Sequence, residues 1–198
     1  MPRPDVSDER KLQIINAAMQ VFTRKGYHSA TMPEIAAEAG LSVGGLYWYF
    51  KGKDAVVAAI LAQLFDADLD ALAILLAEER PAAERLLAFA QHSVTTFDEQ
   101  RWLIPVGIDL YGAAAHDAQA RGFIQRYLER YREALAALIA QGIERGEFHP
   151  VRPHDAANAL LAMEEGLSLL WAVDPDNIRY REGFAVGVQL FIDGLRRI

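Results

Sequence analysis

The chain has 198 residues, of which 52% are hydrophobic and 24% are charged, enough apolar material for a substantial core. It contains no cysteine, which excludes disulfides, thiolate metal sites and cysteine nucleophiles. The formal net charge of −7 is unevenly distributed. Residues 1–53 hold seven Lys and Arg against five Asp and Glu, a net +2, whereas residues 54–198 hold thirteen against twenty-two, a net −9. This distribution suits phosphate binding at the N-terminal end only.

The first eleven residues are mostly polar, with three acidic and three basic side chains, and have neither the net positive start nor the apolar stretch of a signal peptide. The most apolar run, residues 156–173, contains Asn158, Glu164 and Glu165, which is too polar for a membrane span. We therefore expect a cytoplasmic protein that makes no membrane contact.

The hydrophobic spacing is helical almost throughout, and no stretch alternates as a strand would. We expect an all-α fold of about nine helices. Glycine, proline and capping residues place their ends. The expected helices run from about Ser7 to Gly26, Thr31 to Gly40, 43–50, 53–79, 81–99, a short segment around 102–111, 117–145, 154–173 and 177–197.

The first three helices and the turn 39–42 have the spacing of a helix-turn-helix. Thr31 and Glu34 form a capping-box pattern, Gly40 can adopt a positive φ in the turn, and Ser42 can cap the third helix. The spacing alone is a moderate signal, because capped helix pairs joined by glycine are common in all-α proteins.

The last two expected helices, about 154–173 and 177–197, are apolar on nearly all sides. A helix of this kind needs cover on every side. Gly183 and Gly187, four residues apart, leave room for another backbone to approach. We expect a homodimer in which the two helix pairs form a four-helix interface; the alternative is that both helices are central to the core of a monomer.

The stretch Thr31–Val57 resembles the DNA-binding domain of the tetracycline-repressor (TetR) family of bacterial regulators. It matches the family pattern A-x-x-A-G-[VL]-S at residues 36–42 and G-x-L-Y-x-[HY]-F-x-x-K at residues 44–53. The resemblance covers about residues 8–57. It implies a DNA-binding domain over residues 1–53 and a ligand-binding and dimerisation domain over residues 54–198.

The resemblance also implies which residues contact operator DNA. The expected phosphate contacts are Thr31, Ser42, Tyr47, Tyr49 and Lys53, and the expected base contacts are Val43, Gly44, Gly45 and Trp48, with Tyr47 on the same turn. Two positions depart from the family: Val43 cannot hydrogen-bond a base edge, and Gly45 has no side chain. We therefore expect few direct base contacts, with more of the sequence preference set by DNA deformability. An alternative for Trp48 is that it packs against the first helix.

A small-molecule pocket in residues 54–198, whose occupation moves the long fourth helix, is a further implication of the family. The expected lining residues are His92, Phe97, Trp102, Asp109, Tyr111, Tyr127, Met163, Glu164 and Trp171. Most could equally be core residues. A buried acid beside aromatic rings would suit a cationic ligand, but Glu164 and Glu165 could also pair with arginines across the dimer.

No motif of an enzyme is present: there is no G-x-S-x-G, Gly52-Lys53 is followed by Asp54 rather than Ser or Thr, and His116, His149 and His154 are not spaced as metal ligands. We expect no enzymatic activity, no metal and no cofactor. The predicted function is a ligand-responsive dimeric repressor that binds operator DNA and is released by an unknown small molecule. The alternative is a helical small-molecule-binding protein without sequence-specific DNA function.

Overall fold

The computed structural model describes residues 6–196, and within this range it has nine α-helices, one short 3-10 helix and no strand. The all-α prediction is therefore confirmed. The chain divides into two compact units, Met1–Ala67 and Asp68–Ile198. The division lies inside the continuous helix α4, Lys53–Ala77, rather than after Lys53 as the sequence analysis placed it.

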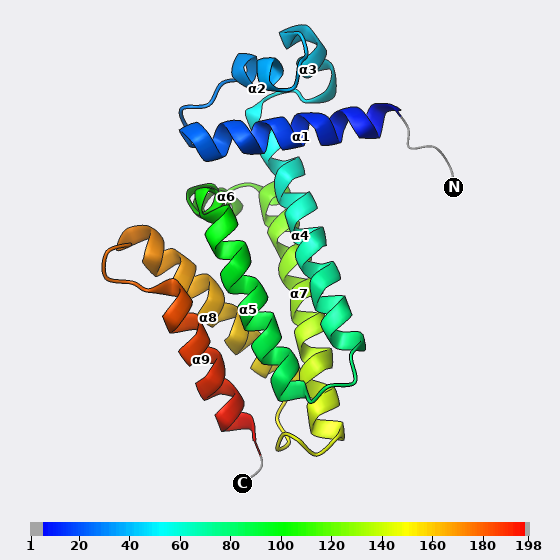
Figure 1. The fold of residues 1–198 in the computed structure, drawn as a ribbon, viewed down its shortest axis with the longest axis vertical. Coiled ribbons are helices and arrows are strands. Elements are labelled where there is room, and N and C mark those ends of the chain that lie inside the picture. Colours follow the sequence, from blue (N-terminus) through cyan, green and yellow to red (C-terminus); the bar gives the residue numbers. More distant parts are fainter. Residues whose placement is uncertain (1–5, 197–198) are drawn as a thin grey trace. The chain divides into compact units, whose positions relative to one another are not determined.

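The first unit contains α1 (Val6–Lys25), α2 (Met32–Glu38), α3 (Val43–Tyr49) and the first part of α4 (Figure 1). Its core is made by apolar side chains that share one face of each helix. Phe22 of α1, Ile35 of α2, Leu46 of α3 and Ile60 of α4 are all fully buried. Within α1 and α4 the buried apolar residues recur three and four positions apart, which places them on one face of each helix.

The helix ends of this unit follow from local chemistry. Gly26 and Gly40 have φ of +78° and +64°, a region that side chains disfavour, and they end α1 and the α2 turn. The amide and the hydroxyl of Thr31 both donate to Glu34 Oε2 at 3.0 Å, and Ser42 Oγ accepts from the Gly45 amide at 3.1 Å. The predicted helix-turn-helix is present.

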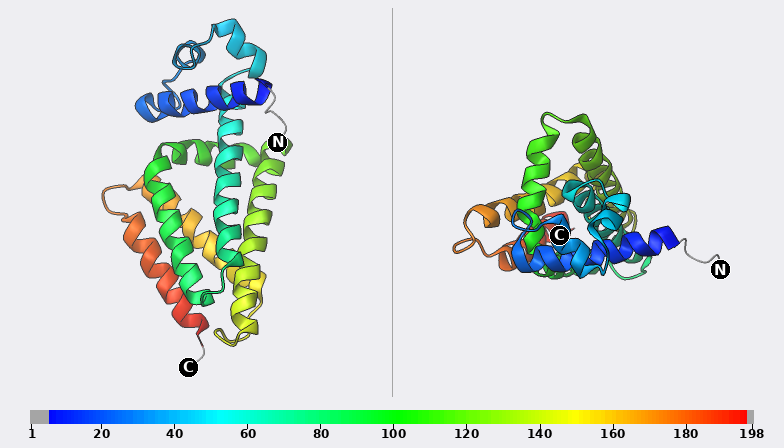
Figure 2. Two further views of the ribbon diagram at one scale, coloured as in Figure 1. Left: turned by 45° about the vertical axis from the view of Figure 1, so that its right-hand side comes forward. Right: turned by 90° about the horizontal axis from the view of Figure 1, so that it is seen from above.

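The second unit is a helical bundle (Figure 2). After the end of α4 it contains α5 (Ala82–Gln100), a 3-10 turn (Arg101–Leu103), α6 (Ile104–Ala114), α7 (Ala118–Glu144), α8 (Pro153–Val173) and α9 (Tyr180–Leu195). Phe89, Leu135, Leu160 and Phe184, one from each of the four long helices, are at most 1% exposed and mark its core.

Glycines set two close helix contacts in this bundle. A Cβ on Gly142 of α7 would collide with the Phe148 ring and with Ala82 of α5, so only glycine fits there. A Cβ on Gly187 of α9 would overlap the thioether of Met163 on α8, and Gly183 faces Leu167. The space predicted beside Gly183 and Gly187 is thus filled by α8 of the same chain.

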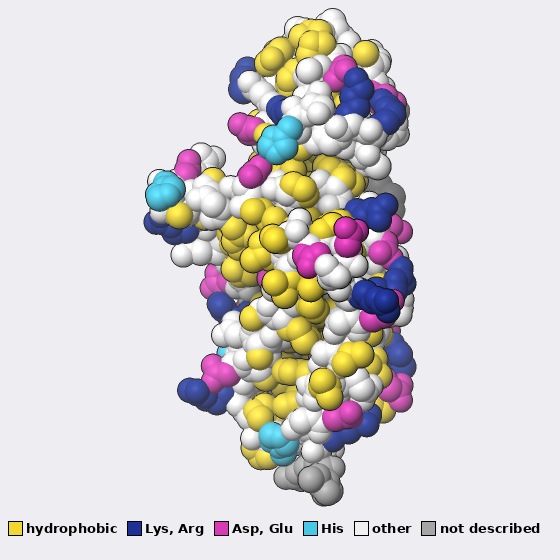
Figure 3. Space-filling view, turned by 90° about the vertical axis from the view of Figure 1, so that its left-hand side faces the viewer, with side chains coloured by type: hydrophobic (Ala, Val, Ile, Leu, Met, Phe, Trp, Pro, Cys, Tyr) yellow, Lys and Arg dark blue, Asp and Glu magenta, His cyan; other side chains and the backbone are white. Residues whose placement is uncertain are grey.

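The outer surfaces of α8 and α9 carry exposed apolar side chains. Leu169, Leu170, Val173, Val186 and Leu190 are between 50% and 78% exposed. Hydrophobic side chains gather on one face of the molecule in the space-filling view (Figure 3). We call these five residues the α8/α9 patch. None of the helices in residues 6–196 is long and apolar enough to cross a bilayer.

Candidate DNA interface and effector site

Helix α3 presents the predicted base-reading residues to solvent. Val43 and Tyr47 are 40% and 44% exposed, and Gly44 is also exposed. Trp48 is 69% exposed, and its ring meets the Tyr49 ring edge-on at 4.6 Å. Packing of Trp48 against α1, the alternative considered above, is therefore not what the structure has, and the indole is available to a partner.

The two predicted hydroxyl contacts, Thr31 and Ser42, are exposed and also serve as helix caps. Both side chains lie at helix N-termini, where free backbone amides and the helix dipole favour an anion. A phosphate contact at either residue is compatible with its capping role because a hydroxyl can donate and accept at once.

The Lys53 side chain does not extend freely into the solvent, where a phosphate could reach it. Its Nζ atom donates to the carbonyl oxygens of Tyr27 at 2.6 Å, Ala30 at 3.1 Å and His28 at 3.3 Å, and lies 4.3 Å from the centre of the Tyr27 ring. An ammonium has three protons, and three acceptors surround this one. Its role as a DNA contact stays a prediction, while its role in holding the α1–α2 loop is observed.

Lys51, which the sequence analysis did not single out, is exposed two residues earlier. Its Nζ atom reaches the Tyr47 carbonyl only at 3.4 Å, a long hydrogen bond at the end of α3. Of the two lysines it is the more accessible to a phosphate.

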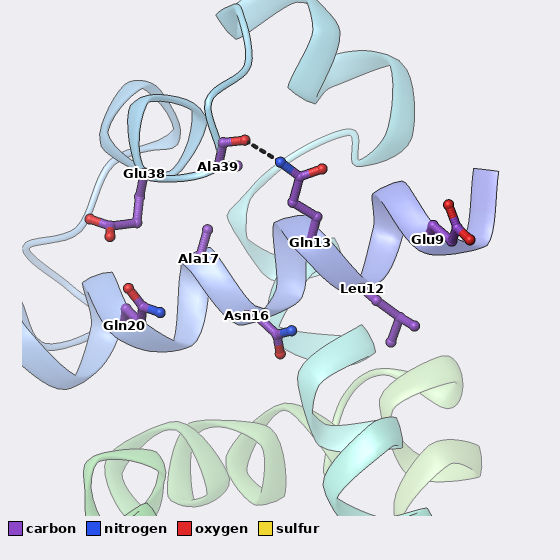
Figure 4. A pocket seen from close by; sticks show the side chains of 8 residues that line it. All are labelled: Glu9, Leu12, Gln13, Asn16, Ala17, Gln20, Glu38 and Ala39. Carbon is purple, nitrogen blue, oxygen red and sulfur yellow. Dashed lines mark hydrogen bonds between the residues drawn. The ribbon is translucent and has the colours of Figure 1, made fainter. Parts of the chain in front are cut away.

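A small open groove runs along α1 beside the end of α2 (Figure 4). Gln13 donates from Nε2 to the Ala39 carbonyl at 2.7 Å, which ties α1 to the helix-turn-helix turn. The groove is lined by Glu9, Leu12, Gln13, Asn16, Ala17, Gln20, Glu38 and Ala39. The groove is shallow and open to solvent, which suits a packing role of Gln13 better than ligand capture.

Glu164 of α8 is the most strongly perturbed acid of the second unit. Burial raises its pKa to about 8, Ser93 moderates the rise, and the neighbouring carboxyls of Glu165 and Asp68 add to it. Ser93 on α5 is 5% exposed, and its Oγ atom makes no hydrogen bond of normal geometry. A carboxyl that is largely protonated at neutral pH therefore interacts with a buried serine hydroxyl.

Asp68 of α4 faces the same group of side chains. Its Oδ1 atom lies 3.1 Å from His92 Nε2, and burial raises its pKa against the opposing effects of His92 and Thr96. His92 is thus not a solitary core histidine. It holds an acid that belongs to the same cluster as Glu164.

Tyrosines from three helices surround these acids. Burial raises the pKa of Tyr127 and Tyr131 on α7 and of Tyr180 on α9, and in each case Glu164 is the next largest cause. On α6, burial raises the pKa of Tyr111, followed by the charge of Glu165. The phenol rings and the carboxyls therefore lie in one region, from which Tyr111 reaches the solvent.

An aromatic stack adjoins this region. The rings of Phe97 and Tyr180 are parallel with centroids 3.7 Å apart, and Trp171 meets Phe97 edge-on at 5.1 Å. We refer to Asp68, Ser93, Glu164 and Glu165 with Tyr111, Tyr127, Tyr131 and Tyr180 as the acidic tyrosine cluster.

The structure brings some predicted ligand residues together and separates others. Glu164, Tyr111 and Tyr127 belong to the cluster, His92 joins it through Asp68, and Phe97 and Trp171 join it through Tyr180. The remaining three lie elsewhere: Asp109 is exposed on α6, Trp102 is half-buried in the 3-10 turn, and Met163 packs on Gly187. Asp109 is therefore not the buried acid that its apolar sequence neighbours suggested.

Two segments match known protein families. Residues 14–60 match the bacterial regulatory proteins of the tetR family, and residues 82–186, more than half of the chain, match the C-terminal domain of BetI-type transcriptional repressors. The chain belongs to the TetR family. It is a ligand-responsive DNA-binding transcriptional regulator and not an enzyme.

Individual known proteins are similar to this chain in sequence or in fold. The chain is 28% identical over 170 residues to the uncharacterized HTH-type transcriptional regulator YfiR of Bacillus subtilis, covering 81% of this chain and 78% of that one. A transcriptional regulator from Saccharomonospora viridis in complex with choline has a TM-score of 0.82 at 20% identity, covering 96% of this chain and 100% of the other. FadR of Bacillus subtilis in complex with stearoyl-CoA has a TM-score of 0.75 at 21% identity, covering 93% and 99%.

Proposed function

We propose that this TetR-family protein is a homodimeric repressor that leaves its operator when a small organic cation binds in the acidic tyrosine cluster. The observation that supports the effector class is Glu164, a half-buried carboxyl that has no basic partner among the described residues and lies among tyrosine rings. We place its action in the cytoplasm, where bacterial operator DNA lies.

The DNA contacts we propose begin at α3. Exposed Trp48, Tyr47 and Val43 support base contacts in the major groove, and the capped helix N-termini at Thr31 and Ser42 support phosphate contacts. Gly44 and Gly45 allow the backbone of α3 to approach the DNA closely, and Tyr49 and Lys51 flank it. The preference for one DNA sequence over another then depends on a few direct base contacts and on how easily each sequence deforms.

The dimer we propose forms through α8 and α9. Its support is the α8/α9 patch, whose five large apolar side chains stay exposed in the single chain. A two-fold dimer would bind a pseudo-palindromic operator with half-sites about 34 Å apart or a multiple of that distance.

Two ligand chemistries occur among the structural neighbours, a quaternary ammonium in one and an acyl thioester in the other. Three carboxyls and four phenols suit a cation, because a carboxylate pairs with it and aromatic faces attract it. A long acyl chain would instead leave these polar groups buried without partners, at a cost of about 1–3 kcal/mol for each.

The test uses the purified full-length protein and labelled DNA from the intergenic region beside its own gene. Specific complexes should form, weaken with added salt by about 0.9 log unit per log unit for each neutralised phosphate, and dissociate when amines are added. Release by stearoyl-CoA but by no amine would overturn the effector class. Absence of any specific complex would overturn the operator location.

A further inference from the structure

The two compact units are joined inside helix α4. The first unit ends at Ala67 and the second begins at Asp68, while α4 runs unbroken from Lys53 to Ala77. Its sequence contains neither proline nor glycine, the residues at which helices usually kink. A change in the direction of α4 therefore reaches its first turn. Whether α3 follows depends on how firmly that turn is attached to the rest of the first unit.

The chain connection and the core contacts leave the angle between α4 and α3 open to small changes. Residues 50–52 are all that join the end of α3 at Tyr49 to the start of α4 at Lys53. Val56 and Ile60 of α4 are fully buried and hold it in the core of the unit. Apolar burial is non-directional, so it tolerates small rotations. Directional contacts are what can fix the angle.

Tyr27, in the loop between α1 and α2, makes such contacts with the first turn of α4. Its hydroxyl donates a hydrogen bond to Asp54 Oδ1. Its carbonyl accepts a hydrogen bond from Lys53 Nζ at 2.6 Å, and the same Nζ atom lies 4.3 Å from the centre of its ring. The first two residues of α4 therefore contact Tyr27 at its backbone, its ring and its hydroxyl.

The α1–α2 loop is attached equally well to the helices on either side of it. The Tyr27 ring meets the ring of Phe22, a fully buried residue of α1, edge-on with centroids 5.7 Å apart. Lys53 Nζ also donates to the Ala30 carbonyl at 3.1 Å, directly before Thr31, the N-cap of α2. A rotation of the first turn of α4 therefore moves the end of α1 and the start of α2, and through α2 it moves α3.

We propose that Tyr27 is a positioning residue that makes α4 and the helix-turn-helix turn as one body. The direction of α4 then sets the spacing of the two α3 helices in a dimer. This inference rests on the homodimer of the proposed function and adds the residue that links α4 to its DNA-binding end. Helix-turn-helix dimers bind half-sites one helical turn apart or a multiple of it, so a stiff attachment makes affinity depend steeply on that spacing.

The test compares operators of different half-site spacing. Footprinting of the full-length protein on the intergenic DNA beside its own gene locates the operator, and gel shift measures binding to it and to versions with one base pair inserted or deleted at its centre. One base pair shifts a half-site by about 3.4 Å and turns it by about 35°. The wild type should lose at least about tenfold in affinity, because its two halves no longer bind together. We call this factor the spacing penalty.

Tyr27→Phe removes the hydroxyl and keeps the ring and the carbonyl. Its spacing penalty should be smaller than that of the wild type by about three- to tenfold, roughly the factor that one hydrogen bond contributes. Thr23→Val is the matched control, because it also removes one hydroxyl of the first unit, but one that donates to the Met19 carbonyl within α1. Its spacing penalty should equal that of the wild type.

Asp54 tests the same hydrogen bond from the side of α4. Asp54 is exposed, so its variants should fold even where a change at Tyr27 disturbs the core. Asp54→Ala should reduce the spacing penalty as Tyr27→Phe does, whereas Asp54→Asn keeps an acceptor for the phenol and should retain most of it. Loss of a charge near the DNA changes the affinity for all operators alike and cancels in the ratio.

The outcomes separate this inference from the proposed function. A hydroxyl that only stabilised the fold would leave the spacing penalty unchanged when it is removed, and thermal unfolding measures that loss of stability directly. If the wild type shows a spacing penalty that Tyr27→Phe and Asp54→Ala both retain, the role of Tyr27 is wrong while the dimer on a pseudo-palindrome stands. If the wild type binds all spacings equally, both fail.

Discussion

The Lys53 Nζ atom donates a hydrogen bond of 2.6 Å to the Tyr27 carbonyl, and it closes the loop between α1 and α2 from the first turn of α4. This one ammonium satisfies carbonyls at three positions of that loop. The loop determines where α2, and with it α3, is held. A residue expected from the sequence to clamp DNA thus also holds the DNA-binding unit together.

We therefore predict that Lys53→Met lowers the free energy of unfolding by about 1–3 kcal/mol, because three carbonyls, two of them partly buried, lose a charged donor. Chemical denaturation measures this loss. Lys51→Met is the matched control, since Lys51 is exposed, and it should weaken DNA binding without changing stability. Lys53 would act mainly on DNA if two results came together. The Lys53→Met protein would be as stable as the wild type, and the dependence of its DNA affinity on salt concentration would correspond to one phosphate contact fewer.

The helix ends show how far the sequence can predict this fold. Gly26, Gly40, Thr31 and Ser42 act on their own neighbours in the chain, so their roles were predictable, and the structure has them. The boundary between the two units inside α4 was not predictable, because no change of composition marks a boundary within a continuous helix.

The candidate effector site was only partly predictable, for a related reason. Glu164 was found because a charged side chain in an apolar helix is conspicuous, and Tyr127 because aromatic residues recur along its helix at helical spacing. Asp68, Ser93 and Tyr180 were missed, because their importance depends on contacts between helices far apart in the sequence. Asp109 looked equivalent to Glu164 in sequence, yet it is exposed.

Trp48 provides a prediction about specificity. Its side chain is 69% exposed, so Trp48→Ala should change stability by less than about 0.5 kcal/mol. We expect it to weaken binding to the preferred operator by about 1–3 kcal/mol and to relax the preference at one base step. Binding measured against a panel of single-substituted operators tests this.

Tyr47→Phe is the comparison for Trp48→Ala, because it removes a hydroxyl expected at a phosphate and keeps the ring. It should weaken all operators about equally. If Trp48→Ala also weakens all operators equally, the assignment of Trp48 to base reading is wrong.

The α8/α9 patch predicts the oligomeric state. Leu190 of α9 is 67% exposed in the single chain, and Leu190→Glu would place a charge in the proposed interface. We expect it to shift the protein from dimer to monomer and to reduce operator affinity at least about tenfold, since the two half-sites would no longer be bound together.

Ile74→Glu is the control for Leu190→Glu, because Ile74 is similarly exposed, at 65%, but lies on α4. Sedimentation equilibrium measures the mass of each variant. A Leu190→Glu protein that remains dimeric, or an Ile74→Glu protein that dissociates, would place the interface elsewhere.

Glu164 makes the stability of the protein depend on pH. Burial raises its pKa from the ordinary 4.5 to about 8, so between these values the folded protein binds more protons than the unfolded chain. The free energy of unfolding should therefore fall as the pH rises from 4.5 through 8. The Glu164→Gln variant cannot ionise at this position, so its stability should not fall with pH for this reason. At pH 8 it should be more stable than the wild type. Denaturant unfolding at several pH values measures both effects.

The same proton opposes the effector. A cation that pairs with the Glu164 carboxylate must displace it, so the affinity for an amine should rise by up to about tenfold per pH unit below pH 8, provided the amine itself stays protonated. Calorimetry in buffers of different ionisation enthalpy should detect close to one released proton at pH 7. Burial also raises the pKa of Asp68 and of Glu165, the other acids of the cluster, so the comparison with Glu164→Gln isolates the proton that Glu164 itself releases. Binding without proton release in the wild type, or equal release in Glu164→Gln, would show that the cation does not pair with Glu164.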